Sequence, residues 1–151
     1  MMASMKTRHL LFIFPLAIII YLFWPAQLTD EQQIRMIIVT AQQGLKDKNI
    51  QDLVSPISES YTDDEGLDRQ IIYGMAFQQF QKRGSLNLSI SEIQVVLEGE
   101  TAVAYFDVGL IEGNTSQFLL LPEDGDTMAF EVDFEKQDGE WKVISHRRER
   151  N

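Results

Sequence analysis

The sequence predicts an α+β domain that follows an N-terminal transmembrane helix. Apolar residues recur at helical spacing between residues 29 and 83 and alternate with a period of two after residue 84. Helices first and strands after them favour two or three helices packed on one face of a curved antiparallel sheet of four or more strands, a cone-shaped roll. A chain of 151 residues has room for one such domain.

Residues 10–28 form an apolar segment that is long enough to cross a membrane as a helix. Only Gln27 is strongly polar in it, and its helical length of about 28 Å is close to a hydrocarbon core of about 30 Å. The alternative is a cleaved signal peptide. Cleavage after Ala26 would place the bulky Trp24 at a position that requires a small residue, so an uncleaved signal-anchor is favoured.

The charges on either side of this segment predict its orientation. Lys6 and Arg8 precede it, whereas all 23 acidic residues of the chain follow it. The positive-inside rule then assigns residues 1–9 to a cytoplasmic tail and residues 29–151 to a soluble domain on the extracytoplasmic side, the periplasmic side of a bacterial inner membrane. We therefore expect a single-pass membrane protein.

The charge and composition of the soluble part exclude several classes of function. It carries 11 basic and 23 acidic residues, a net charge of −12, which repels nucleic-acid phosphates. Its one basic cluster, Arg147, Arg148 and Arg150, lies at the C-terminus and contains Glu149. No nucleic-acid partner is expected. The chain has no cysteine, which excludes disulfides, thiolate metal sites and cysteine nucleophiles.

Three helices are predicted before residue 84. The first spans residues 29–48, where Thr29 and Gln32 match a capping box. Its apolar stripe consists of Ile34, Ile37, Ile38, Ala41 and Leu45. A short helix at residues 50–54 and a longer one at residues 67–83 follow, and the glycine after the third helix suits a C-cap.

The second half of the domain predicts antiparallel strands. Alternating residues place them at residues 86–97, 101–111, 118–121, 128–137 and 140–148. The phase of the alternation changes at Ser91-Glu92, which predicts a β-bulge inside the first of them.

The last two strands form the clearest hairpin, with its turn at Asp138-Gly139. Counting back from a two-residue turn gives the pairs Gln137–Glu140, Glu135–Lys142, Phe134–Val143 and Glu131–His146. This register puts Phe134 and Val143 on a packed face and His146 beside Glu131 on a charged face.

The hairpin carries a family resemblance. The pattern Phe130-x-Val132-x-Phe134 followed by Asp138-Gly139-Glu140-Trp141-Lys142-Val143 resembles the nuclear transport factor two-like superfamily, the cystatin-like α+β cone. The resemblance covers residues 30–148. The segment from Ser60 to Arg69 is similar to a loop and helix start in uncharacterised bacterial members. The resemblance implies the fold and frequent homodimers through the sheet, but no activity, because the superfamily holds isomerases, dehydratases and epoxide hydrolases beside binding and assembly domains.

An isomerase-type site would need a carboxylate base and a hydrogen-bond donor facing an apolar pocket. The residues that could serve are Asp107 with Tyr105 on one strand face, and Tyr61 or Tyr73 from the helical half. Asp107 lies opposite the apolar face of its strand, so we expect it to face solvent. No catalytic residue is assigned.

His146 is the single histidine of the soluble part. Beside Glu131 it would be an imidazolium in a surface ion pair rather than a general base. A metal site from His146, Glu131 and Asp133 would have few ligands of the kind zinc prefers. No motif for a phosphate, a nucleotide or another cofactor is present, and no metal or cofactor is predicted.

The sequence favours a membrane-anchored extracytoplasmic domain without catalysis that binds a protein partner or supports assembly. Two alternatives stay open. One is a binder of a small apolar ligand in the cone, and the other is an isomerase or dehydratase-type lyase that uses Asp107 and a tyrosine. Both alternatives need a pocket with at least one polar group, whereas the assembly hypothesis predicts a filled cone.

Overall fold

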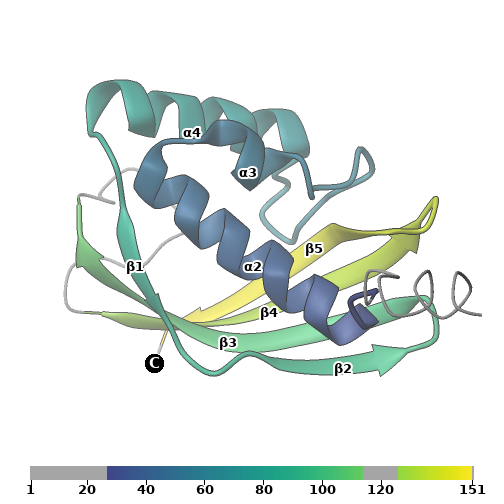
Figure 1. Ribbon diagram of the computed structural model, residues 1–151. Helices are drawn as coiled ribbons and strands as arrows, with labels where there is room; N and C mark the ends of the chain where they lie inside the picture. Colours follow the sequence, from purple (N-terminus) through teal and green to yellow (C-terminus); the bar gives the residue numbers. More distant parts are fainter. Residues whose placement is uncertain (1–26, 114–125, 151) are drawn as a thin grey trace, which may run out of the picture.

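The computed structural model describes residues 27–113 and 126–150, which form three helices and five strands (Figure 1). The helices are α2 (Asp30–Asp47), α3 (Ile50–Val54) and α4 (Arg69–Lys82). The strands are β1 (Asn87–Ile90), β2 (Gln94–Glu98), β3 (Thr101–Glu112), β4 (Thr127–Gln137) and β5 (Glu140–Arg150). The helices lie together over one face of the sheet in Figure 1, which confirms the predicted α+β architecture.

The sheet is antiparallel, with the strand order β1-β3-β4-β5, and β2 also pairs with β3. β1 and β2 follow one another along β3, because Ile90 pairs with Val108 and Gln94 with Tyr105. Residues 91–93 lie opposite residues 106–107 of β3, so one extra residue is present at the place where the bulge was predicted. The chain breaks the ladder there and starts a second short strand, and this break changes the phase of the side chains.

Two predictions fall outside the described residues. The predicted strand at residues 118–121 lies in the gap, and nearly all of the predicted transmembrane segment, residues 10–28, precedes the first described residue. Both stay predictions. No helix within residues 27–113 and 126–150 combines the length and the apolar character that crossing a membrane requires.

The start of α2 is fixed by its own capping residues and by contacts with the β4–β5 hairpin. Thr29 and Gln32 form the predicted capping box. Oδ1 of Asp30 accepts hydrogen bonds from Nζ of Lys136 at 2.8 Å and from Nε1 of Trp141 at 2.9 Å. These hydrogen bonds lower the pKa of Asp30. The first turn of α2 is thereby tied to the β4–β5 hairpin.

The core lies between the helices and the covered face of the sheet. One cluster joins Ile34 and Ile38 of α2 to Ala102 and Ala104 of β3 and to Phe134 of β4. The small alanines leave room for the helix to approach the sheet. A second cluster joins the other end of α2 to α4, β1 and β3, and its members include Leu45, Ile72, Ala76, Leu86 and Leu88.

The β4–β5 hairpin has the predicted register next to its turn and a different register further along. The predicted pairs present are Gln137–Glu140, Glu135–Lys142 and Phe134–Val143. One extra residue of β5, Ile144, then bulges out of the ladder. Beyond it His146 pairs with Val132, so the predicted pairing of His146 with Glu131 is wrong. A one-residue slip exchanges the two faces of a strand, and it turns His146 toward the helices.

Candidate functional site

A pocket of about 190 Å³ lies between the helices and the covered face of the sheet; we call it the cone pocket. Its walls come from all three helices, the segment after α3, and strands β1, β3, β4 and β5. Most of the lining is aliphatic or aromatic, and the sheet contributes Phe106, Phe130 and Phe134. The polar side chains in the lining are Gln42, Tyr61 and His146. An apolar pocket with a few convergent polar groups is typical of small-molecule sites.

Tyr61, Asp63 and His146 meet at one side of the cone pocket; we call them the polar triad. The Tyr61 hydroxyl donates to Oδ2 of Asp63 at 3.1 Å, and its oxygen lies 2.5 Å from Nδ1 of His146. Nδ1 of His146 is 3.4 Å from Oδ2 of Asp63. The Asp63 side chain is 1% exposed and the His146 side chain 11%, so these contacts are shielded from bulk water.

The position of the Asp63 carboxylate is fixed by its own loop. Oδ1 accepts hydrogen bonds from the backbone N–H of Glu65 at 3.0 Å and of Leu67 at 2.9 Å. Oδ2 is left for the Tyr61 hydroxyl. The side chain of Glu65 also pairs with Arg148 of β5, which holds the loop against the sheet. Asp63 therefore serves as a turn residue and as a member of the polar triad.

The segment that carries Tyr61 lies along β5. The N–H of Ser58 donates to the carbonyl of Val143 at 2.9 Å, and the N–H of Val143 donates to the carbonyl of Pro56 at 2.8 Å. The N–H of Thr62 donates to the carbonyl of Ile144, the bulged residue, at 3.2 Å. The bulge thus turns His146 inward and also provides an acceptor for the segment that contains the other two members of the triad.

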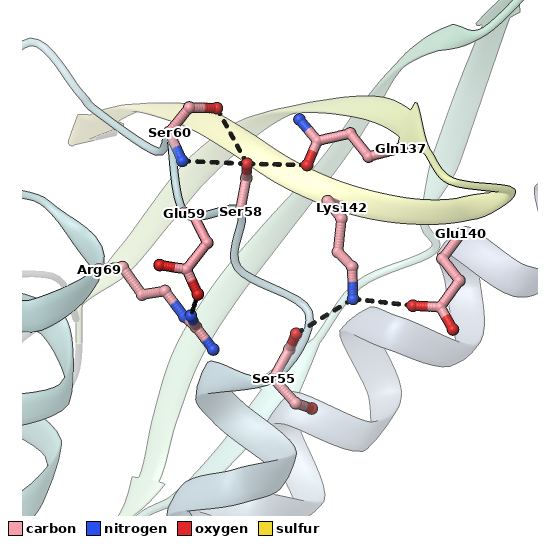
Figure 2. Close-up of polar contacts among 8 residues, drawn as sticks. All are labelled: Ser55, Ser58, Glu59, Ser60, Arg69, Gln137, Glu140 and Lys142. Carbon is pink, nitrogen blue, oxygen red and sulfur yellow. Dashed lines mark hydrogen bonds and ion pairs between the residues drawn. The ribbon is translucent and has the colours of Figure 1, made fainter.

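Side-chain contacts add to this attachment, as Figure 2 shows. Oγ of the buried Ser58 donates to Oε1 of Gln137 at 3.0 Å and accepts the N–H of Ser60 at 3.2 Å. Arg69, the first residue of α4, forms an ion pair with Glu59. The contacts of Lys142 in the same region are with Glu140 Oε2 at 3.0 Å and the Ser55 carbonyl at 3.4 Å. The loop is held at both the hairpin and the helix.

Burial favours the neutral form of the His146 ring. It lowers the pKa of His146, against the raising effect of the Asp63 carboxylate. Burial also raises the pKa of Tyr61, and the negative charge of Asp63 raises it further. The ring of His146 lies between those of Phe130 and Tyr61, with centroid distances of 6.0 Å and 6.3 Å. The sequence-based expectation of an imidazolium on a charged face is wrong because His146 faces the core.

Of the four candidate residues from the sequence, Tyr61 lines the cone pocket and the other three do not. Asp107 and Tyr105 lie on the opposite face of the sheet, since they alternate along β3 with the buried Ala104. They border a separate depression of about 370 Å³ on that face, which also contains Glu131 and Arg147. Tyr73 is 43% exposed on α4.

The residues considered for a metal site do not come together. His146 faces the helices, whereas Glu131 and Asp133 lie on the opposite face of the sheet, where Arg147 pairs with Glu131. Within residues 27–113 and 126–150, no three His, Asp or Glu side chains are arranged to hold a metal ion. Asp63 uses its oxygens for Tyr61 and for the backbone of its loop.

Sequence reasoning missed two polar residues of the site. Asp63 is one of several acidic residues in the segment from Ser60 to Arg69, and its position two residues after Tyr61 places both on one short loop. Gln42 lies beside the apolar stripe of α2, and its Nε2 donates to the carbonyl of Leu88 at 2.7 Å. A polar residue next to a buried stripe was the available signal for it.

Comparison with known proteins identifies the fold. No family model matches the sequence, and no curated protein matches it. Many solved structures do match, and several of them are described as NTF2-like or cystatin-like. This confirms the predicted nuclear transport factor two-like, or cystatin-like, fold.

Three of these structures illustrate the extent of the likeness. An NTF2-like protein from Cytophaga hutchinsonii has 12% identity and a TM-score of 0.67, over 82% of this chain and 100% of that one. A cystatin-like protein of unknown function from Nostoc punctiforme has 9% identity and a TM-score of 0.62, over 83% and 95%. An NTF2-like protein of unknown function from Pseudomonas putida has 15% identity and a TM-score of 0.61, over 81% and 88%. Identities this low establish the fold alone.

Proposed function

We propose that this domain binds a small, largely apolar molecule in the cone pocket. The observation that carries the proposal is a pocket of about 190 Å³ whose apolar lining is interrupted by the polar triad. A cone filled by side chains would have favoured the assembly hypothesis instead. The lyase alternative based on Asp107 is not favoured, because Asp107 does not line this pocket and lies on the opposite face of the sheet.

The volume limits the size of the ligand. An engineered cavity of about 150 Å³ in another protein accommodates benzene, so about 190 Å³ suits a molecule of about ten non-hydrogen atoms at most. A ligand of this size binds with a dissociation constant of roughly 10 µM to 1 mM when its surface is mainly apolar. A substituted benzene such as para-ethyltoluene is a suitable probe.

Filling the pocket tests the proposal. Ala41 lines the pocket from α2, so Ala41→Phe should occupy it and weaken binding of para-ethyltoluene by at least about tenfold. Val39→Phe is the matched control, because Val39 is 52% exposed on the same helix. Binding is followed by ligand-detected NMR on the full chain in detergent, with thermal unfolding as a check on folding. Equal binding by both variants, or failure of the unsubstituted chain to bind any substituted benzene of this size, contradicts the proposal.

A second function, association with a protein partner, is favoured by an exposed apolar ridge on α4. Tyr73 and Phe77, four residues apart on one side of the helix, form this ridge; they are 43% and 49% exposed, and their rings stack with centroids 6.4 Å apart. α4 contains no Asp or Glu, in contrast to the acidic domain around it. Clustered exposed aromatic residues are typical of protein interfaces.

We propose that the partner of this ridge is another protein of the same membrane, because the predicted anchor ends directly before Thr29 and would hold the domain near a bilayer. A photo-crosslinker at Phe77 should give a discrete product in membranes that Tyr73→Glu abolishes. A crosslinker at the exposed Gln94 should not give it. Identical products from both sites, or none from Phe77, would rule the ridge out.

The anchor needs its own test. A topology reporter fused after Asn151 should be active on the extracytoplasmic side if residues 10–28 span the membrane with a cytoplasmic N-terminus. Activity on the cytoplasmic side would overturn the orientation, and release of a shortened chain into the soluble fraction would indicate a cleaved signal peptide.

A further inference from the structure

The proton arrangement of the polar triad determines which ligands the cone pocket suits; this inference rests on the proposed function above. A carboxylate only accepts hydrogen bonds. Oδ1 of Asp63 is occupied by two backbone N–H groups, and Oδ2, in a side chain that is 1% exposed, needs a donor. The Tyr61 hydroxyl at 3.1 Å supplies it.

The Tyr61 hydroxyl has one proton, so it has none for His146. Its oxygen is nevertheless 2.5 Å from Nδ1 of His146, which requires a hydrogen between the two atoms. The donor must then be Nδ1. In the reverse arrangement Tyr61 would donate to Nδ1. The hydroxyl oxygen and Oδ2 of Asp63 would then be two acceptors 3.1 Å apart with no hydrogen between them, which is unfavourable. In a neutral ring with hydrogen on Nδ1, Nε2 carries a lone pair and accepts.

The other polar side chain of the lining also has an acceptor to offer. Nε2 of Gln42 donates to the carbonyl of Leu88 at 2.7 Å, which identifies the other terminal atom of the amide, Oε1, as the oxygen. Among the described residues neither Oε1 of Gln42 nor Nε2 of His146 has a hydrogen-bond donor. Oε1 of Gln42 and Nε2 of His146 are therefore acceptors without a donor, while Nε2 of Gln42 keeps a second hydrogen besides the one on the Leu88 carbonyl.

We propose that the cone pocket binds a small apolar molecule that carries a hydroxyl group, an alcohol or a phenol, and that this hydroxyl donates a hydrogen bond to Nε2 of His146. A ligand with only a carbonyl or ether oxygen would place an acceptor against an acceptor. A hydrocarbon of the same shape would leave Nε2 desolvated and without a partner. Both should bind about tenfold or more weakly than the hydroxyl compound.

Three probes of nearly equal size separate these cases on the full chain in detergent at neutral pH. Para-ethylphenol donates, para-ethylbenzaldehyde only accepts, and para-ethyltoluene does neither. The expected order of affinity is phenol first, with the other two at least about tenfold weaker. Equal affinities, or tightest binding of the aldehyde, would overturn the ligand class while the pocket function stands. Failure of all three to bind would overturn the pocket function itself and this inference with it.

Two variants connect the preference to His146. His146→Phe retains an aromatic ring between Phe130 and Tyr61 but removes both nitrogens, and His146→Asn can keep a donor toward Tyr61 while removing Nε2. Both should bind phenol and toluene probes with similar affinity. A preference for the phenol that persists in both variants would show that another residue accepts the hydroxyl.

The tautomer can be measured without any ligand. In a long-range proton–nitrogen NMR spectrum of the full chain labelled at histidine, His146 should have its hydrogen on Nδ1. His9→Gln removes the signals of the second histidine and leaves those of His146. A spectrum with hydrogen on Nε2, or on both nitrogens at neutral pH, would overturn the proposed hydrogen-bond direction.

Discussion

His146 and Val132 are paired across β5 and β4, and this pairing places the imidazole inside the cone rather than on the charged face of the sheet. The inward position brings Nδ1 to 2.5 Å from the Tyr61 hydroxyl. It also replaces the expected neighbour, Glu131, by the buried carboxylate of Asp63. The function proposed for the cone pocket depends on this pairing.

Removal of the Tyr61 hydroxyl should destabilise the domain. In Tyr61→Phe the buried Oδ2 of Asp63 loses its donor and Nδ1 of His146 loses its acceptor, so we expect a loss of about 1–3 kcal/mol in the free energy of unfolding. The matched control is Tyr73→Phe, at an exposed position, with an expected change within about 0.5 kcal/mol. Urea unfolding of the two variants measures the difference, and similar losses would contradict a hydrogen-bonded triad.

The stability of the domain should decrease as the pH falls below about 6.5, the ordinary pKa of histidine. The pKa of His146 is lower in the folded than in the unfolded state, so the unfolded state takes up its proton first. Above that pH the free energy of unfolding has its full value. Below it, the free energy of unfolding decreases by at most about 1.4 kcal/mol per pH unit until the pH reaches the lower pKa of the folded state. The charged groups around the ring are Asp63, Asp64, Glu65 and Arg148.

Urea unfolding at pH 7.5 and 5.5 tests this dependence in a range above the ordinary pKa values of carboxylates. The His146→Phe variant should lose most of the difference between the two pH values. The His9→Gln variant should keep it, because residues 1–9 precede the soluble domain. An increase in stability toward pH 5.5 would mean that Asp63 favours the imidazolium more than burial opposes it.

Most elements of the fold could be predicted because they depend on residues close in sequence. The capping box of Thr29 and Gln32 is complete within one turn of helix, and the turn before Glu140 follows from its Asp-Gly pair. The register beyond the turn could not be obtained by counting. The adjacent Val143 and Ile144 interrupt the alternation of β5, and this interruption is the local sign of the bulge.

The site was harder to predict than the fold because it depends on contacts between distant residues. Tyr61 and His146 are 85 positions apart, and their meeting requires both the bulge and the backbone hydrogen bonds that attach the loop to β5. The volume of the pocket follows from how Phe106, Phe130 and the side chains of α2 pack together. No periodicity of the sequence reports that volume.

Ser58 should stabilise the attachment of the loop with Tyr61 and Asp63 to the β4–β5 hairpin. In Ser58→Ala the backbone N–H of Ser60 and Oε1 of Gln137 lose their shared partner at a buried position, which should cost about 1–2 kcal/mol. Looser attachment of Tyr61 should also weaken binding of the phenol probe. Ser55→Ala is the control, because Ser55 is exposed and contributes its backbone carbonyl to Lys142. Unchanged stability and binding in Ser58→Ala would refute this role.

Gly44 and Gly74 are both in helices, yet substitution by alanine should change the stability of the domain in opposite directions at the two positions. A Cβ at Gly44 would lie 2.9 Å from the carbonyl oxygen of Asn49 and 2.9 Å from Cβ of Asp52, where α2 packs on α3. Overpacking should outweigh the helix preference of alanine and destabilise by about 1–2 kcal/mol. Gly74 has nothing within 4 Å of its Cβ position, so Gly74→Ala should stabilise by about 0.5–1 kcal/mol. Thermal unfolding decides, and a stabilising Gly44→Ala would contradict the close contact of α2 with α3.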